Sequence, residues 1–142
     1  MSASDGRPAG AELFCIHAAA AGEGRYRVEG MISYTEQGVL VQLIGGEQPH
    51  VGTVLLCQPR ASLADPAAVS VTTSVLNLVG HKDDEAARPV GELLAKRLNR
   101  TVVVTAGIHI DRAAPQELEL LCQNVDRVAA ELLAWAERRQ SG

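Results

Sequence analysis

The sequence predicts an α+β fold, with a mixed β-sheet of about five to six strands, a βαβ crossover and a long C-terminal helix packed on the sheet. Two observations favour it. Strand-like patterns fill the first half of the chain, and helical patterns come late, in the order helix, strand, helix. In the stretch from Thr72 to Asp111 a helix joins two strands, and strands joined in this way run parallel through a right-handed crossover.

Length and charge limit the class of protein. A chain of 142 residues corresponds to one domain; we expect residues 1–10 to be a disordered tail and residues 11–142 to form that domain. The net charge is −4 with both signs scattered, which argues against a nucleic-acid partner. No apolar run approaches the roughly 20 residues of a membrane span, so no membrane association is expected. The first ten residues carry no signal-peptide core.

Cysteine and aromatic usage adds two expectations. Cys15, Cys57 and Cys122 are far apart, odd in number and without metal-type spacing. They indicate reduced core thiols in a cytoplasmic protein. The chain has only one Phe, one Trp and two Tyr, so the core must be built from aliphatic side chains.

The N-terminal half reads as strands in order. Residues 12–20 form a weakly indicated first strand, because an alanine run blurs the pattern. Tyr26–Tyr34 alternates apolar and polar side chains, and Val39–Ile44 returns as an apolar strand after a tight turn, so the two segments predict a hairpin. The glycines at 45 and 46 break that strand, and the break continues to Gly52.

The second half begins with two further strands and a loop. We expect strands at Val51–Cys57 and Ser70–Val79, separated by a polar loop at Gln58–Pro66. A helical stripe follows within Asp83–Leu98. Because Pro89 lies inside this segment, the helix either starts near Glu85 or is kinked.

The last strand and the last helix are indicated most clearly. Residues 102–110 alternate, so that Val102 and its like-facing neighbours form an apolar face, while Gly107, His109 and Asp111 share the other face. Pro115 suits the first turn of the final helix, which carries a continuous leucine and valine stripe. Parallel strands end at one sheet edge, so a turn at residues 80–82 should lie near His109.

A metal site is one interpretation of this edge. Three of the four histidines, His50, His81 and His109, sit at strand ends or turns, and imidazole is the commonest metal ligand. With Glu85 adding a carboxylate, His81 and His109 could hold a divalent metal ion. The alternative is that these histidines only form hydrogen bonds at turns, because the chain lacks a tight ligand pair such as His-x-x-x-His.

An anion site is the second interpretation. Gly80, His81 and Lys82 precede a helix, whose exposed N–H groups and positive end favour phosphate. Acids at 83–85 either complement the helix dipole or point to a metal bridging the phosphate. The residues predicted to bind a cofactor are Gly45, Gly46, His50, Thr72, Thr73, Ser74, Gly80, His81, Lys82, Gly107 and His109.

Three pieces of the sequence carry a family resemblance. They are GGEQPHVG at 45–52, TTSVLNLVGHKDDEAARPVGELLAKRLNRTVVVTAGIHID at 72–111, and the Ala-Pro-x-Glu helix that follows. Together they resemble the prenylated-flavin chaperone family, the small D subunit that accompanies gallate decarboxylase. The resemblance spans roughly Arg25 to Leu133.

The resemblance implies a non-catalytic, homodimeric accessory protein. It would bind prenylated FMN, with FMN as a possible surrogate, and hold or deliver it to a UbiD-type decarboxylase. A flavin prenyltransferase is a further possible partner. Two alternatives stay open: a small metal-dependent lyase or hydrolase using His81, His109 and Glu85, and a purely structural decarboxylase subunit.

Overall fold

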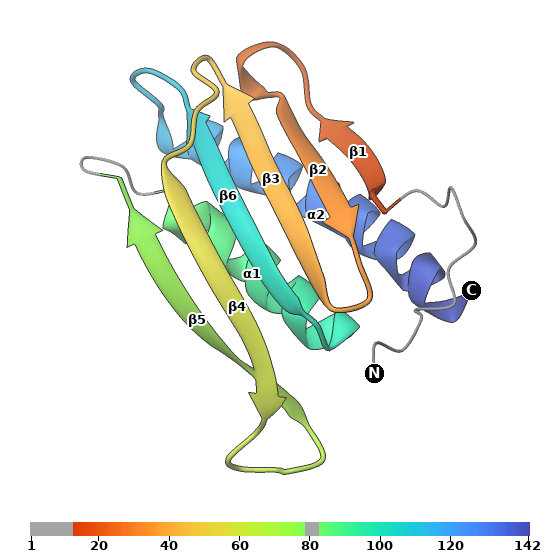
Figure 1. Cartoon of the computed structure of the whole chain (residues 1–142). Coiled ribbons are helices and arrows are strands. Elements are labelled where there is room, and N and C mark those ends of the chain that lie inside the picture. Colours follow the sequence, from red (N-terminus) through yellow and green to blue (C-terminus); the bar gives the residue numbers. More distant parts are fainter. Residues whose placement is uncertain (1–12, 79–82) are drawn as a thin grey trace.

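The computed structural model describes residues 13–78 and 83–142, so the predicted tail at 1–10 and the turn at 80–82 lie outside the described residues. Within those ranges the chain forms a six-stranded mixed sheet and two α-helices, which confirms the α+β prediction (Figure 1). The elements are β1 (Cys15–Ala21), the 3₁₀ turn η1 (Gly24–Tyr26), β2 (Val28–Tyr34), β3 (Gly38–Gly46), β4 (Thr53–Ala61), β5 (Val69–Asn77), α1 (Asp84–Leu98), β6 (Thr101–His109) and α2 (Pro115–Ser141).

The strand order is β1-β2-β3-β6-β4-β5, so the last strand in sequence lies inside the sheet. β6 runs parallel to β3 and antiparallel to β4. β5 is antiparallel to β4, so β5 and β6 are parallel, as the crossover predicted, but they are not neighbours. Thr53 of β4 lies between them and pairs with both Asn77 and Ala106.

Two predicted strand boundaries were wrong. β4 continues to Ala61, where a loop from Gln58 was expected; pairing with β6 ends at Cys57, so Pro59 has a strand partner on one side only, where proline is tolerated. β3 extends through Gly46 because that residue still pairs with β6. The start of α1 at Asp84 agrees with the predicted start near Glu85, and Pro89 lies beyond the first turn of the helix.

Both helices cover the same face of the sheet (Figure 1). α1 packs on β4, β5 and β6, and α2 packs on β1 and β2. As the alternation predicted, Val102, Val104 and Ala106 of β6 are buried on this face. Aliphatic side chains form the centre of the core, among them Ile32, Leu43, Leu55, Leu94, Leu98 and Leu132. Within the described residues, neither helix is long and apolar enough to cross a membrane.

The opposite face of the sheet is not covered by either helix of the described chain (Figure 1). Side chains on this face alternate with the buried ones along each strand. Several are large and apolar, and those that are substantially exposed are Ile16, Met31, Leu40, Leu56 and Leu76. We call this surface the open face. An apolar surface of this kind on a folded protein usually marks an interaction site.

The three cysteines differ in their surroundings. All are free thiols, but only Cys57 lies in the core; Cys15 is partly exposed and Cys122 is exposed. Burial raises the pKa of Cys57 above its ordinary value of 9.0. The expectation of core thiols therefore holds for Cys57 and is wrong for Cys122.

One buried polar side chain interrupts the apolar stripe of α2. Asn124 is 1% exposed, and its amide donates a hydrogen bond of 2.8 Å to the carbonyl of Tyr26. It also lies directly against Gly22, where a β-carbon would clash with the amide. Asn124 therefore holds the segment around η1 onto the final helix.

We predict that Asn124→Ala lowers the free energy of unfolding by about 1–3 kcal/mol, because the partly buried Tyr26 carbonyl loses its donor. Chemical denaturation of the two proteins measures the difference. Gln123→Ala, at the exposed neighbouring position, is the control and should change stability by less than about 0.5 kcal/mol. Equal losses in both variants would contradict the role assigned to the amide.

Candidate functional site

The chain must cross the end of β6 to pass from β3 to β4, because β6 lies between them in the sheet. We call residues 47–52 the crossing segment. Its first residue donates a backbone hydrogen bond of 2.7 Å to the carbonyl of His109, and its last, Gly52, donates one of 2.8 Å to the carbonyl of Ala106. The crossing segment is therefore fixed at both ends to β6. It forms part of the sheet edge where the sequence predicted a ligand site.

Glycines make this crossing possible. Gly46 has a φ of +76°, in the left-handed region that favours glycine, and a β-carbon there would clash with the backbone of His109. A β-carbon at Gly107 would clash with the carbonyl of His50. A β-carbon at Gly45 would also lie too close to the carbonyl of Arg27. The sequence interpretation left these glycines open for a ligand; in the structure the close approach is made by the chain itself.

Asp83 anchors the crossing segment to two other elements. One carboxylate oxygen accepts a hydrogen bond of 3.0 Å from the backbone N–H of Ile108, and the other lies 3.1 Å from Nε2 of His50. Nδ1 of His50 lies 2.7 Å from the carbonyl of Gln48. The start of α1, the end of β6 and the crossing segment thus meet at a carboxylate whose side chain is only 9% exposed.

The role of Asp83 was missed in the sequence. Acids at 83–85 were interpreted as partners of the helix dipole or of a metal-bridged phosphate, but Asp83 itself bonds within the chain. Both ring nitrogens of His50 face oxygens of this chain, so its side chain positions the crossing segment. The sequence feature that could have indicated this role is the position of Asp83 immediately before the helix that starts at this sheet edge.

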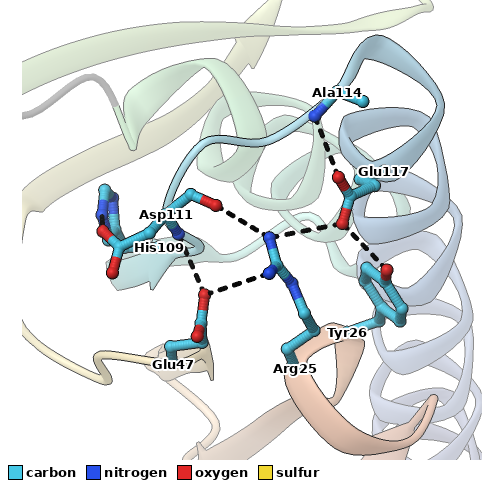
Figure 2. Close-up of polar contacts among 7 residues, drawn as sticks. All are labelled: Arg25, Tyr26, Glu47, His109, Asp111, Ala114 and Glu117. Atoms are coloured by element: carbon cyan, nitrogen blue, oxygen red, sulfur yellow. Dashed lines mark hydrogen bonds and ion pairs between the residues drawn. The ribbon is translucent and has the colours of Figure 1, made fainter.

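A second cluster lies beside the crossing segment and centres on Arg25 (Figure 2). Its guanidinium lies 3.7 Å from the Glu47 carboxylate and 3.3 Å from that of Glu117, and it donates a hydrogen bond of 2.8 Å to the carbonyl of Asp111. Glu47 also accepts a hydrogen bond of 3.0 Å from the Asp111 N–H. We call these residues, with Tyr26, the Arg25 cluster. It joins η1, the crossing segment and the loop that leads into α2.

Glu117 of the Arg25 cluster accepts hydrogen bonds from two further groups. It accepts hydrogen bonds of 3.0 Å from the N–H of Ala114 and 2.8 Å from the hydroxyl of Tyr26 (Figure 2). The Ala114 N–H, followed by the Tyr26 hydroxyl, lowers the pKa of Glu117 below its ordinary value of 4.5. The same contact raises the pKa of Tyr26. The sequence indicated the Pro-x-Glu start of α2 but not the contact with Tyr26, which lies 91 positions earlier in the chain.

His109 ends β6 next to the Arg25 cluster. Its Nε2 lies 2.9 Å from a carboxylate oxygen of Asp111, and its side chain is 47% exposed (Figure 2). The carbonyl of His109 is held by the crossing segment, so its position is fixed by the backbone while the ring faces solvent. His109 is therefore the predicted histidine that the described structure leaves accessible to a ligand.

The predicted strand hydroxyls do not reach this edge. Thr72, Thr73 and Ser74 lie in the middle of β5, and Thr73 is four residues, about 13 Å, from the end of its strand. The hydroxyl of Thr73 donates a hydrogen bond of 2.8 Å to Glu92 on α1, and that of Thr72 accepts one of 2.9 Å from Arg60. These residues lie on the strand that precedes residues 80–82, as expected, but in its middle, and their role in cofactor binding stays a prediction.

The metal prediction is only partly covered by the structure. Gly80, His81 and Lys82 lie outside the described residues, and Glu85 is exposed on the first turn of α1. Across residues 13–78 and 83–142 no group of three His, Cys, Asp or Glu side chains is arranged to hold a metal ion. A metal ligated by His81, His109 and Glu85 stays a prediction.

Comparison with known proteins first identifies the fold. The structure is similar to a chain from the crystal structure of a novel chaperone complex for yeast 20S proteasome assembly, with a TM-score of 0.58 and 13% sequence identity. The similarity covers 88% of this chain and 98% of that one. At this identity it shows a shared fold. No curated protein matches the sequence.

The family is shown by the sequence itself. Residues 22–137 match the prenylated flavin chaperone LpdD-like domain, and the chain belongs to that family. The match confirms the resemblance derived from the motifs at 45–52 and 72–111. A family of chaperones also agrees with the prediction of a non-catalytic accessory protein.

We predict that Asp83→Asn loosens the crossing segment. The amide has a single oxygen, so when this oxygen accepts from the Ile108 N–H an N–H₂ group replaces the carboxylate oxygen that faces His50, and stability should fall by about 1–3 kcal/mol. Amide hydrogen exchange at Gly52 and Ile108 should accelerate in parallel. Asp84→Asn is the control, because Asp84 bonds only to the exposed Asn77 in the described contacts. Unchanged exchange at Gly52 in Asp83→Asn would contradict this anchoring role.

We predict that the stabilising effect of Glu117 depends on pH. Folding lowers its pKa, so its contribution is present above the ordinary value of 4.5 and is lost as pH falls through the lower folded value. Wild type should therefore exceed Glu117→Gln in unfolding free energy at pH 7, and the difference should shrink below pH 4.5. Urea denaturation across this range measures it, with exposed Glu119→Gln as control. A difference independent of pH would exclude a role for the carboxylate charge.

Proposed function

We propose that this protein binds prenylated FMN without turning it over, and holds it or delivers it to a UbiD-type decarboxylase. The observation that carries the proposal is membership of the prenylated flavin chaperone family over residues 22–137. Family membership supports this proposal of a decarboxylase client, and a flavin prenyltransferase is proposed as a further partner that supplies the cofactor. A cytoplasmic location is part of the same proposal.

The sheet edge supplies chemistry that suits the phosphate of such a cofactor. His109 is accessible there, Arg25 lies alongside between two carboxylates, and the segment Gly80–Lys82 was predicted to present N–H groups and a cation. We propose that His109 contacts the phosphate, directly or through a divalent metal ion shared with His81 and Glu85. Gly45, Gly46 and Gly107 would contribute by keeping the crossing segment close to β6.

We further propose that the protein is a homodimer, with the open face at or near the contact between the two copies. Support comes from the exposed apolar side chains of that face, such as Leu40 on β3 and Leu56 on β4. Two-fold dimers are also the commonest soluble oligomers.

A purely structural decarboxylase subunit is the second candidate function. The observation that favours it is again the open face, which could bind a larger protein and need no cofactor. The two candidates differ in whether flavin binds to the isolated protein. A metal-dependent enzyme would instead need turnover of a substrate that chelation abolishes.

We predict that the protein purifies with a flavin absorbance spectrum when it is co-produced with a flavin prenyltransferase, and that it transfers this cofactor to an apo UbiD-type decarboxylase. Light scattering should give twice the chain mass. His109→Ala should weaken cofactor binding, while His17→Ala, on β1 beside α2, should not. A colourless protein that still binds the decarboxylase would favour the structural candidate.

A further inference from the structure

The open face is hollowed over the strands β1, β2 and β3. The hollow has a volume of about 400 Å³, within the size range of small-molecule sites. We call it the β1–β3 hollow. Its lining comes from neighbouring positions of three strands, namely Ala18, Ala19, Ala20, Arg27, Glu29, Gly30, Met31, Gln42 and Ile44.

Differences in side-chain size along the paired strands create this hollow. Ala20 pairs with Glu29, and Ala18 pairs with Met31, so each small side chain on β1 lies beside a longer one on β2. Ala18 and Ala20 are exposed and alternate with the buried Ala19, which places both on the open face. The result is a low, flat apolar floor with a raised wall on the β2 and β3 side.

The wall of the hollow combines apolar and polar groups. Met31 provides a thioether surface and Ile44 an aliphatic one. Sulfur packs well against aromatic rings. At one end Arg27 is held by Glu29, with Nε and Nη2 at 3.1 and 2.9 Å from the same carboxylate oxygen. Gln42 adds a neutral amide. A flat floor with donors and acceptors along one side suits a planar heteroaromatic ring that has polar atoms on its edge.

The hollow continues towards the sheet edge described above. The carbonyl of Arg27 accepts a hydrogen bond of 3.1 Å from the N–H of Gly46, and Gly46 pairs with His109. β2 and β6 are separated only by β3, so Arg27 and His109 lie about 10 Å apart across the sheet. Gly46, which carries no side chain, lies between them in the sheet. An extended ligand could place a ring in the hollow and a phosphate beside His109.

We propose that the β1–β3 hollow binds the isoalloxazine ring of the flavin, with its phosphate tail passing over Gly46 to the His109 edge. This inference rests on the proposed function and assigns the ring to a part of the molecule remote from α1. It also connects cofactor binding to assembly. A second copy on the open face would cover the ring and close an otherwise shallow site.

The proposal is tested with a substitution that fills the β1–β3 hollow. Ala20→Phe adds a large side chain at an exposed position of β1, so the core is untouched and the floor is blocked. Gln58→Phe is the matched control: it places the same side chain at an exposed position of the open face on β4, outside the hollow. The dissociation constant for prenylated FMN should rise at least tenfold in Ala20→Phe and less than threefold in Gln58→Phe. Light scattering on both variants separates loss of the ring site from loss of the dimer.

Methyl spectra of the unmodified protein give a second readout that does not depend on a variant. With alanine methyls labelled, saturating FMN should shift the Ala18 and Ala20 signals upfield through the ring current, and inorganic phosphate should leave them in place. Flavin binding with no shift at these methyls, or equal affinity in Ala20→Phe, would overturn the hollow and leave the proposed function standing. If the unmodified protein binds neither FMN nor prenylated FMN, the proposed function fails and the hollow with it.

Discussion

The position of β6 between β3 and β4 imposes a crossing on the chain, and most features of the candidate site follow from that crossing. A strand inserted in this way must be passed by the connection between its two neighbours. The connection has to lie close to the end of β6 because its terminal residues bond to β6 backbone. Glycine is required where the backbones meet, at Gly46 and Gly107, and a carboxylate is required to hold the passing segment, at Asp83.

The two faces of the sheet serve different purposes. One face carries both helices and the aliphatic core that holds the domain together; each fully buried Leu or Ile there contributes roughly 1.5–3 kcal/mol of transfer free energy. The other face retains large apolar side chains that a lone domain has no need to expose. Polar groups are concentrated at the sheet edge, in the Arg25 cluster and around Asp83. Stability and recognition are thus built from different surfaces of the same strands.

Much of the fold could be predicted from local patterns, because alternation and helical stripes are properties of short segments. The apolar face of β6 and the start of α2 at Pro115 are examples. Strand order could not be predicted, since nothing in the sequence of β6 says that it enters between β3 and β4. That gap explains why β4 was not expected between β5 and β6.

Only part of the candidate site could be identified from the sequence, for the same reason. His109 and the crossing glycines were identified because motif and strand end coincide in the sequence. Arg25 and Tyr26 were missed because their contacts with Asp111 and Glu117 span 86 and 91 residues. Single charged residues at such separations leave no local pattern, and only the folded sheet brings them together.

The inserted strand also dictates an order of folding. β1, β2 and β3 are joined by successive antiparallel pairings, and β4 pairs with β5, so each of these two groups can form from nearby chain. They share no direct pairing, and the sheet becomes continuous only when β6 enters between them. On a ribosome the two halves therefore emerge with unpaired inner edges, which remain open until residues 101–109 are synthesised. Closure of the sheet and assembly of the His109 edge are then the same late event.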